Sequence, residues 1–196
     1  MFIILNIVGL IIFLFIFWKR LKEDYLPNQI FSTFFSILFF MLLTYFVSIN
    51  LLPTWWFWCT FLGFILGLII GILRFKLKFY ETFEAAFLGF LICFSLYFLG
   101  DSVKNLNIIS FAGFVISVIL IGIFQYIDLH YKNYSWYKSG KVGFTGLILS
   151  AIFFLVRVLT YNFFPNTLSL VNIYEIYLSS VSSFIFVALT YNLSRS

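Results

Sequence analysis

The sequence predicts an all-α integral membrane protein with about seven transmembrane helices, forming a single transmembrane domain over residues 1–196. Hydrophobic residues make up 63% of the chain and charged residues only 10%, whereas a soluble domain of this length needs many more charges at its surface. The apolar residues form blocks of roughly 17 to 24, long enough to cross a hydrocarbon core of about 30 Å as helices. A helix satisfies its own backbone hydrogen bonds where water is absent, and the short alternating segments of a β-barrel are not seen.

The first two predicted spans cover residues 2–18 and 30–52. Lys19, Arg20 and Lys22 follow the first span. A secretory signal peptide has its basic residues before the apolar stretch, so we expect a retained helix here.

The third predicted span covers residues 54–73, and Trp55, Trp56 and Trp58 cluster at its outer end, where indole rings prefer the headgroup layer. Gly63, Gly67 and Gly71 recur every four residues and form a ridge on one face of this helix. Such a ridge either lets a neighbouring helix pack closely or forms a groove for a lipid tail or a substrate.

The fourth span is predicted at residues 81–99, with Glu81 and Glu84 at its start. Carboxylates there are stabilised by the positive end of the helix dipole, so capping explains both residues. Asp101 and Lys104 follow the span and are expected in a solvated loop.

The last three spans are predicted at residues 107–127, 142–163 and 168–191. Between the first two of them, residues 131–138 alternate aromatic residues with lysines. In a membrane protein this pattern favours an interfacial loop on anionic lipid over a nucleic-acid site.

Charge alternates strongly between the connections. The odd-numbered connections and the C-terminal tail carry ten cations, namely Lys19, Arg20, Lys22, Arg74, Lys76, Lys78, Lys132, Lys138, Lys141 and Arg195. The even-numbered connections carry only Lys104. By the positive-inside rule, the N-terminus lies outside the cytoplasm and the C-terminus inside, which requires an odd number of spans.

Arg157 is the most informative candidate for a functional residue, because a cation within a span is costly unless it finds a partner or water. Glu175 reaches a similar depth in the next predicted span, so we expect the two to approach each other as a salt bridge. Tyr161 lies one turn from Arg157 on the same face. The pair either locks two helices together or lets Arg157 bind an anionic lipid headgroup from the outer leaflet through paired hydrogen bonds.

Other kinds of site have little support. Cys59 and Cys93 lie within predicted spans and are expected to be small apolar core residues. His130 is the single histidine, so a zinc or haem site has too few ligands, and we predict no metal or cofactor. No motif of a protease or an ATPase is present.

Residues 138–146, the apolar run to Arg157 and the following residues 163–166 resemble the C-terminal segment of prolipoprotein diacylglyceryl transferases. In that family a basic loop and a glycine precede a span with an essential arginine. Residues 17–24 and 58–71 are similar to the family's first inner loop and glycine-rich third span. The motifs are degraded: no histidine lies near Thr60 to Gly63, and Tyr161 replaces an acidic residue.

The resemblance implies a multi-pass protein of the bacterial cytoplasmic membrane that transfers diacylglycerol from phosphatidylglycerol to the lipobox cysteine of a prolipoprotein. Arg157, Tyr161 and Glu175 would form its site, without a cofactor and without nucleic acid as a partner. Two alternatives stay open. One is a non-catalytic lipid-binding or scaffolding protein of the same fold, and the other is a small-solute carrier subunit.

Overall fold

The computed structural model describes residues 2–131, 142–163, 169–170 and 174–195. These residues form seven α-helices and one 3-10 turn: α1 (Phe2–Leu21), α2 (Pro27–Leu51), η1 (Pro53–Trp55), α3 (Trp56–Phe75), α4 (Phe79–Asn105), α5 (Ile108–His130), α6 (Phe144–Phe163) and α7 (Glu175–Arg195). All seven α-helices are long and apolar enough to cross a membrane. The predicted all-α fold and the number of helices of membrane-spanning length are therefore confirmed for the part of the chain that the structure describes.

Two helix boundaries differ from the prediction in ways that matter for the polar residues. Helix α4 continues past residue 99 to Asn105, so Asp101 lies in a helix and not in a solvated loop. Its side chain is only 7% exposed and accepts hydrogen bonds from Asn105 and Ser110. Helix α7 begins at Glu175 and not at residue 168. The predicted interfacial loop falls mostly on residues 132–141, which lie outside the described residues.

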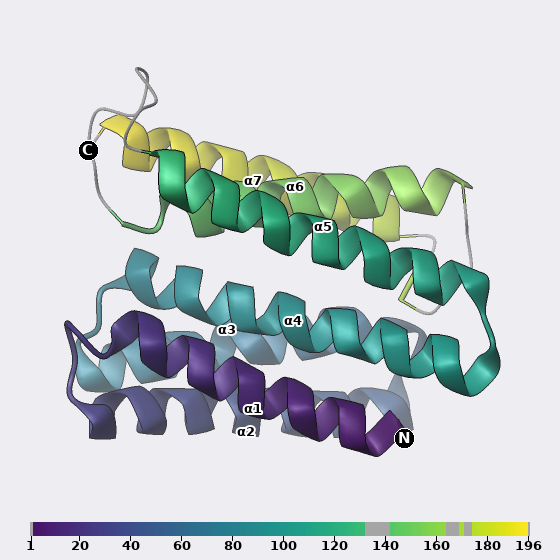
Figure 1. Ribbon diagram of the computed structural model, residues 1–196, viewed down its shortest axis with the longest axis horizontal. Helices are drawn as coiled ribbons and strands as arrows, with labels where there is room; N and C mark the ends of the chain where they lie inside the picture. The colour runs from purple at the N-terminus through teal and green to yellow at the C-terminus, as the bar shows by residue number, and fades with distance from the viewer. Residues whose placement is uncertain (1, 132–141, 164–168, 171–173, 196) are drawn as a thin grey trace.

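The helices run antiparallel to their neighbours in the sequence, and Figure 1 shows α1 to α4 grouped below α5 to α7. The closest packed pairs are α2 with α3, α1 with α4, α6 with α7 and α4 with α5. Helix α4 also contacts α6 and α3, and residues 82–91 in its first half are all buried. A helix that is apolar all round belongs in the interior, which explains its central place.

Apart from Lys104 and the buried Arg157, the described lysines and arginines gather at one end of the bundle, the left end in Figure 1, which we call the basic end. It carries Lys19, Arg20, Lys22, Arg74, Lys76, Lys78 and Arg195. The opposite end, the far end, holds the connections between α2 and α3, α4 and α5, and α6 and α7. The alternation of charge along the sequence thus corresponds to two ends of one bundle.

The glycine ridge of α3 packs directly against α2. A Cβ atom added at Gly67 would lie 2.6 Å from the Cα atom of Ile37, and one at Gly71 would lie 2.5 Å from the side chain of Thr33. The hydroxyl of Ser36 donates a hydrogen bond to the Gly67 carbonyl at 3.1 Å. Two helices can pack this closely only because glycine has no side chain. The ridge is filled by α2, so the alternative of a lipid groove there is wrong.

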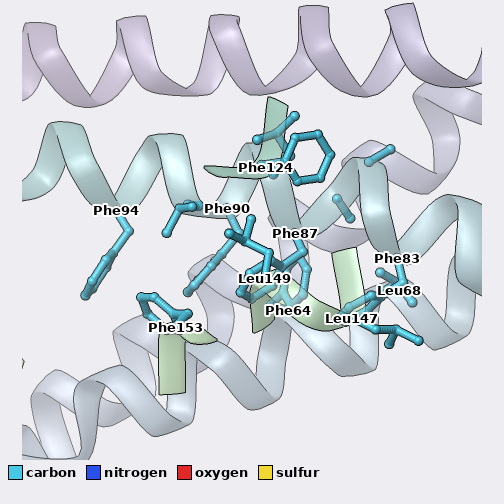
Figure 2. Close-up of a cluster of buried hydrophobic side chains, with 14 of the residues drawn as sticks. Phe64, Leu68, Phe83, Phe87, Phe90, Phe94, Phe124, Leu147, Leu149 and Phe153 are labelled. Atoms are coloured by element: carbon cyan, nitrogen blue, oxygen red, sulfur yellow. The ribbon is translucent and has the colours of Figure 1, made fainter. Parts of the chain in front are cut away.

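Phenylalanine rings form the centre of the bundle between α3, α4 and α6 (Figure 2). Along α4, Phe83, Phe87, Phe90 and Phe94 lie with successive ring centroids 5.7 to 6.1 Å apart. Trp58 of α3 joins this core: it is only 7% exposed and stacks on Phe154. Trp58 therefore belongs to the interior, whereas Trp55 and Trp56 are half-buried.

Candidate functional site

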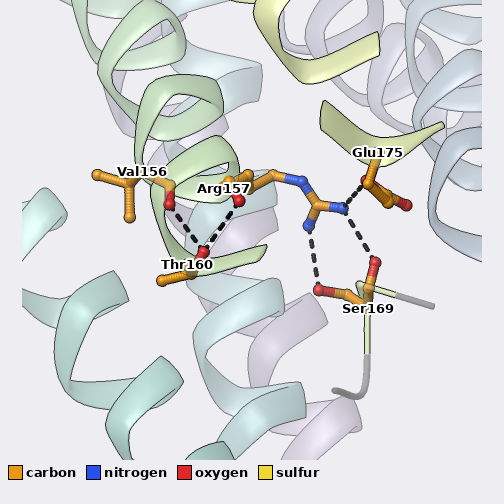
Figure 3. Close-up of polar contacts among 5 residues, drawn as sticks. All are labelled: Val156, Arg157, Thr160, Ser169 and Glu175. Atoms are coloured by element: carbon orange, nitrogen blue, oxygen red, sulfur yellow. Dashed lines mark hydrogen bonds and ion pairs between the residues drawn. The ribbon is translucent and has the colours of Figure 1, made fainter. Parts of the chain in front are cut away.

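Arg157 of α6 and Glu175 of α7 form a buried ion pair. Arg157 Nη2 donates a hydrogen bond to Glu175 Oε2 at 2.7 Å (Figure 3). The two side chains are 5% and 1% exposed. The predicted approach of these residues is confirmed, and the position of Glu175 at the start of α7 places its carboxylate at the positive end of a helix dipole.

Arg157 also binds Ser169, which precedes α7. Arg157 Nη1 donates to Ser169 Oγ and Nη2 donates to the Ser169 carbonyl, each at 3.0 Å. Carbonyls outside regular helices have no partner in their own segment, and in a membrane they must find one in the protein. Arg157 thus supplies donors both to a carboxylate and to the backbone ahead of α7.

The face of the guanidinium group is covered by an aromatic ring. Arg157 Cζ lies 3.5 Å from the centroid of the Phe57 ring, and the Phe153 centroid lies at 5.9 Å. A cation over a ring is attracted by its π electrons. Arg157 Nε has no hydrogen-bond partner among the described residues, although it is buried.

The sequence also predicted Tyr161 as part of this site, one turn from Arg157 in α6. Tyr161 is half-buried, and in the described part of the chain its hydroxyl makes no hydrogen bond to Arg157 or Glu175. Ser169 and Phe57 take its place around the guanidinium. Neither was predicted: Ser169 lay inside an assumed span, and nothing in the sequence distinguishes Phe57 from the other phenylalanines.

Beside Arg157, a cavity of about 250 Å³ lies between α4, α5 and α6 in the half of the bundle near the far end. Four of the residues that line it are polar, namely Arg157, Thr160, Ser169 and Ser117. The rest of the wall is apolar: Phe94, Phe98, Ile108, Ile109, Ala112, Gly113, Ile116, Leu120, Phe153, Val156 and Leu170.

The cavity extends from the surface of the bundle to its core. At one end Ile108 is 80% exposed, whereas Leu120 and Phe153 in the same wall are each only 3% exposed. An exposed apolar surface on a transmembrane helix faces acyl chains of the bilayer. The cavity therefore joins an exposed apolar position at the start of α5 to the buried core, and its wall includes a few polar residues.

A second buried polar cluster lies toward the basic end and was not predicted. Glu84 of α4 is 2% exposed, accepts from Arg20 of α1 at 2.8 Å and accepts from the Gly146 backbone N–H of α6 at 3.1 Å. Arg20 also contacts Asp128 of α5 at 2.9 Å. Glu84 had been expected to cap its own helix, and instead it caps α6. These contacts join four helices.

Tyr25 forms a polar link between two connections at the basic end. Its hydroxyl donates to Glu81 Oε2 and accepts from the backbone N–H of Lys78, both at 3.0 Å. Burial raises the pKa of Tyr25 above its ordinary value, and the adjacent Glu81 carboxylate acts in the same direction. Tyr25 therefore stays neutral at physiological pH and holds the start of α4 against the turn after α1.

Comparison of this chain with protein-family models, with curated proteins and with solved structures gives no match. The resemblance to prolipoprotein diacylglyceryl transferases therefore stays a prediction from the sequence motifs. The functional argument depends on the cavity and on the residues in its wall.

Proposed function

We propose that this protein binds a membrane lipid, with an acyl chain in the cavity between α4, α5 and α6 and the lipid's polar part beside Arg157. The observation that carries the proposal is a largely apolar cavity lined in part by a buried arginine, whose Nε–H has no hydrogen-bond partner among the described residues. Apolar pockets with a few polar groups are the usual form of small-molecule sites.

Physical considerations favour a lipid chain over water or a small polar solute. An apolar cavity stays dry, and one of roughly 150 Å³ already holds a molecule the size of benzene. The side chains around an empty cavity lose dispersion contacts, which a chain restores. The cavity of about 250 Å³ accommodates part of an acyl chain. The predominantly apolar wall also favours a lipid over the substrate of a small-solute carrier subunit.

The proposal predicts that filling the cavity abolishes lipid binding. Ser117 is 3% exposed and lies in the cavity wall, so the Ser117→Phe variant should occupy the space of the chain. The measurement is covalent labelling of the purified protein by an acyl ester with a photoreactive group in its chain. We expect the variant to lose most of the labelling.

Val118→Phe is the matched control, because Val118 is the next residue of α5, is 46% exposed and does not line the cavity. It should be labelled like the wild type. Helix content and elution volume show whether each variant is folded. Equal labelling of wild type and a folded Ser117→Phe variant would contradict the proposal.

The resemblance adds a possible reaction to lipid binding. In the transferase family, diacylglycerol passes from phosphatidylglycerol to a cysteine thiol, with a base for the thiol and cations for the departing glycerol phosphate. We propose Arg157 as the residue of this chain that corresponds by position to the family's essential arginine. Among the cavity-lining residues that the structure describes, none is a histidine, an aspartate or a glutamate.

Transfer to a prolipoprotein is tested with a lipobox-cysteine peptide and phosphatidylglycerol. The transferase proposal predicts a diacylglyceryl peptide with the wild type and none with Arg157→Ala. If the wild type is labelled by lipid but transfers no diacylglycerol, the transferase proposal is refuted and the protein is a lipid-binding or scaffolding protein.

We further propose that the basic end faces the cytoplasm of a bacterium and that the N-terminus lies outside. Its support is the gathering of the described cations at one end, apart from Lys104 and the buried Arg157. A Glu23→Cys variant, whose thiol replaces an exposed side chain near α1, should react with an impermeant maleimide only after the cells are opened. Reaction in intact cells would show that the protein has the opposite orientation and would contradict the proposal.

A further inference from the structure

We infer that the polar group that meets Arg157 is an uncharged hydrogen-bond acceptor of the lipid, such as an ester carbonyl or a hydroxyl, and not a phosphate or a carboxylate. This inference rests on the proposed function and defines the class of lipid group that the site accepts. It departs from the interpretation of Arg157 as a binding site for an anionic headgroup.

Charge balance is the first reason. Glu175 contacts Arg157 at 2.7 Å, and both residues are at least nine-tenths buried, so the pair has no net charge. An anionic group added beside it would be a third buried charge with no cation of its own. Buried charges without partners are strongly unfavourable, whereas an uncharged carbonyl carries no such penalty.

The free donors of Arg157 are the second reason. A guanidinium group has five N–H groups, and here three hydrogen bonds go to Ser169 and Glu175. Nε–H is buried and has no hydrogen-bond partner among the described residues, and counting the three bonds leaves one N–H of Nη1 over. Phe57 covers one face of the group at 3.5 Å. Separate single donors suit acceptors that need one hydrogen bond each, while paired recognition of phosphate needs a free bidentate edge.

The surroundings are the third reason. Ile109 lines the cavity, and the next residue, Ser110, donates its hydroxyl hydrogen to Asp101 of α4. The residue that follows Ile109 in α5 is thus bonded to an acid of α4, Asp101. Lys104, in the last turn of α4, is exposed. An anionic lipid group therefore gains little attraction at the cavity.

The test uses two competitors with the same chain, methyl oleate and oleate, against photolabelling of the purified wild type at alkaline pH, where the fatty acid is ionised. The expected result is that the ester inhibits labelling at a concentration at least about tenfold lower than the carboxylate. Stronger inhibition by oleate overturns the inference and leaves the lipid-binding proposal intact. Failure of both competitors, together with labelling that Ser117→Phe does not reduce, refutes the proposed function itself.

Glu175→Gln provides a second test, because it removes the charge of the partner and keeps its size. Arg157 then becomes a buried cation without a counter-ion, and an anion supplies one. The variant should bind oleate more tightly than methyl oleate, reversing the wild-type order. An unchanged order in the folded variant overturns the inference. If this variant does not fold, the comparison of methyl oleate with oleate on the wild type still tests the inference.

Discussion

Replacing Arg157 by methionine is expected to lower the free energy of unfolding by about 3 to 5 kcal/mol, because one charge of a buried pair is left uncompensated. Glu175 is 1% exposed, so its carboxylate has no access to solvent after the change. The Ser169 carbonyl and hydroxyl lose their donors at the same time. The measurement is equilibrium unfolding in detergent micelles, followed by circular dichroism.

The double variant Arg157→Met, Glu175→Leu separates the ion pair from simple packing. Replacing both charges by apolar groups removes the unpaired carboxylate, so the double variant should be more stable than Arg157→Met alone. Arg74→Met is the control, because Arg74 is exposed at the end of α3, and its effect should stay within about 0.5 kcal/mol. A double variant less stable than the single one would show that the pair is not the source of the loss.

The second large effect is expected at Glu84. Glu84→Ala leaves the Gly146 N–H of α6 without an acceptor and removes one of the two carboxylates that Arg20 contacts. Loss of a buried, charge-assisted pair and of a helix cap together should lower the free energy of unfolding by about 2 to 4 kcal/mol. Thermal unfolding in micelles measures the difference.

Glu84→Gln and Glu23→Ala are the matched variants for this prediction. Glutamine keeps an oxygen acceptor for the Gly146 N–H and loses the charge, so its effect should fall between those of alanine and wild type. Glu23 is exposed in the connection after α1, and its replacement should change stability little. A Glu84→Ala variant that unfolds at the same temperature as Glu23→Ala would refute the role of Glu84 as a link between helices.

The sequence was sufficient to predict the helices and one long-range contact. Hydropathy predicts spans because a transmembrane helix must be apolar over its length whatever it packs against. The contact of Arg157 with Glu175 was predicted because both residues lie at a similar depth in the membrane. A buried cation needs a partner, and the next span has one carboxylate. Hydropathy could not show that α7 begins only at Glu175, because the residues before it include several apolar ones.

The partners of Glu84 and the cavity could not be predicted from the sequence. Arg20 and Gly146 lie 64 and 62 residues away from Glu84 in the chain, and local capping already explained its position. The cavity is set by the side chains of three helices that fail to fill the space between them. The size of the cavity depends on how α5 lies against α4 and α6, and the sequence of a single helix does not determine this arrangement. The sequence left open whether the glycine ridge packs against a helix or forms a groove, and only the structure shows that α2 packs against it.

Mapping the site of lipid attachment tests the central claim most directly. A photoreactive acyl ester bound to the wild type should attach to peptides that contain cavity residues of α4, α5 and α6, such as Phe98, Ile116 and Val156. Mass spectrometry of the digested protein identifies these peptides. The account predicts that the labels are concentrated on the cavity wall of the wild type. In the Ser117→Phe variant the cavity wall should carry no label. Labels spread evenly over the exposed faces of α1 and α2 would show that the lipid only surrounds the protein, and would contradict the account.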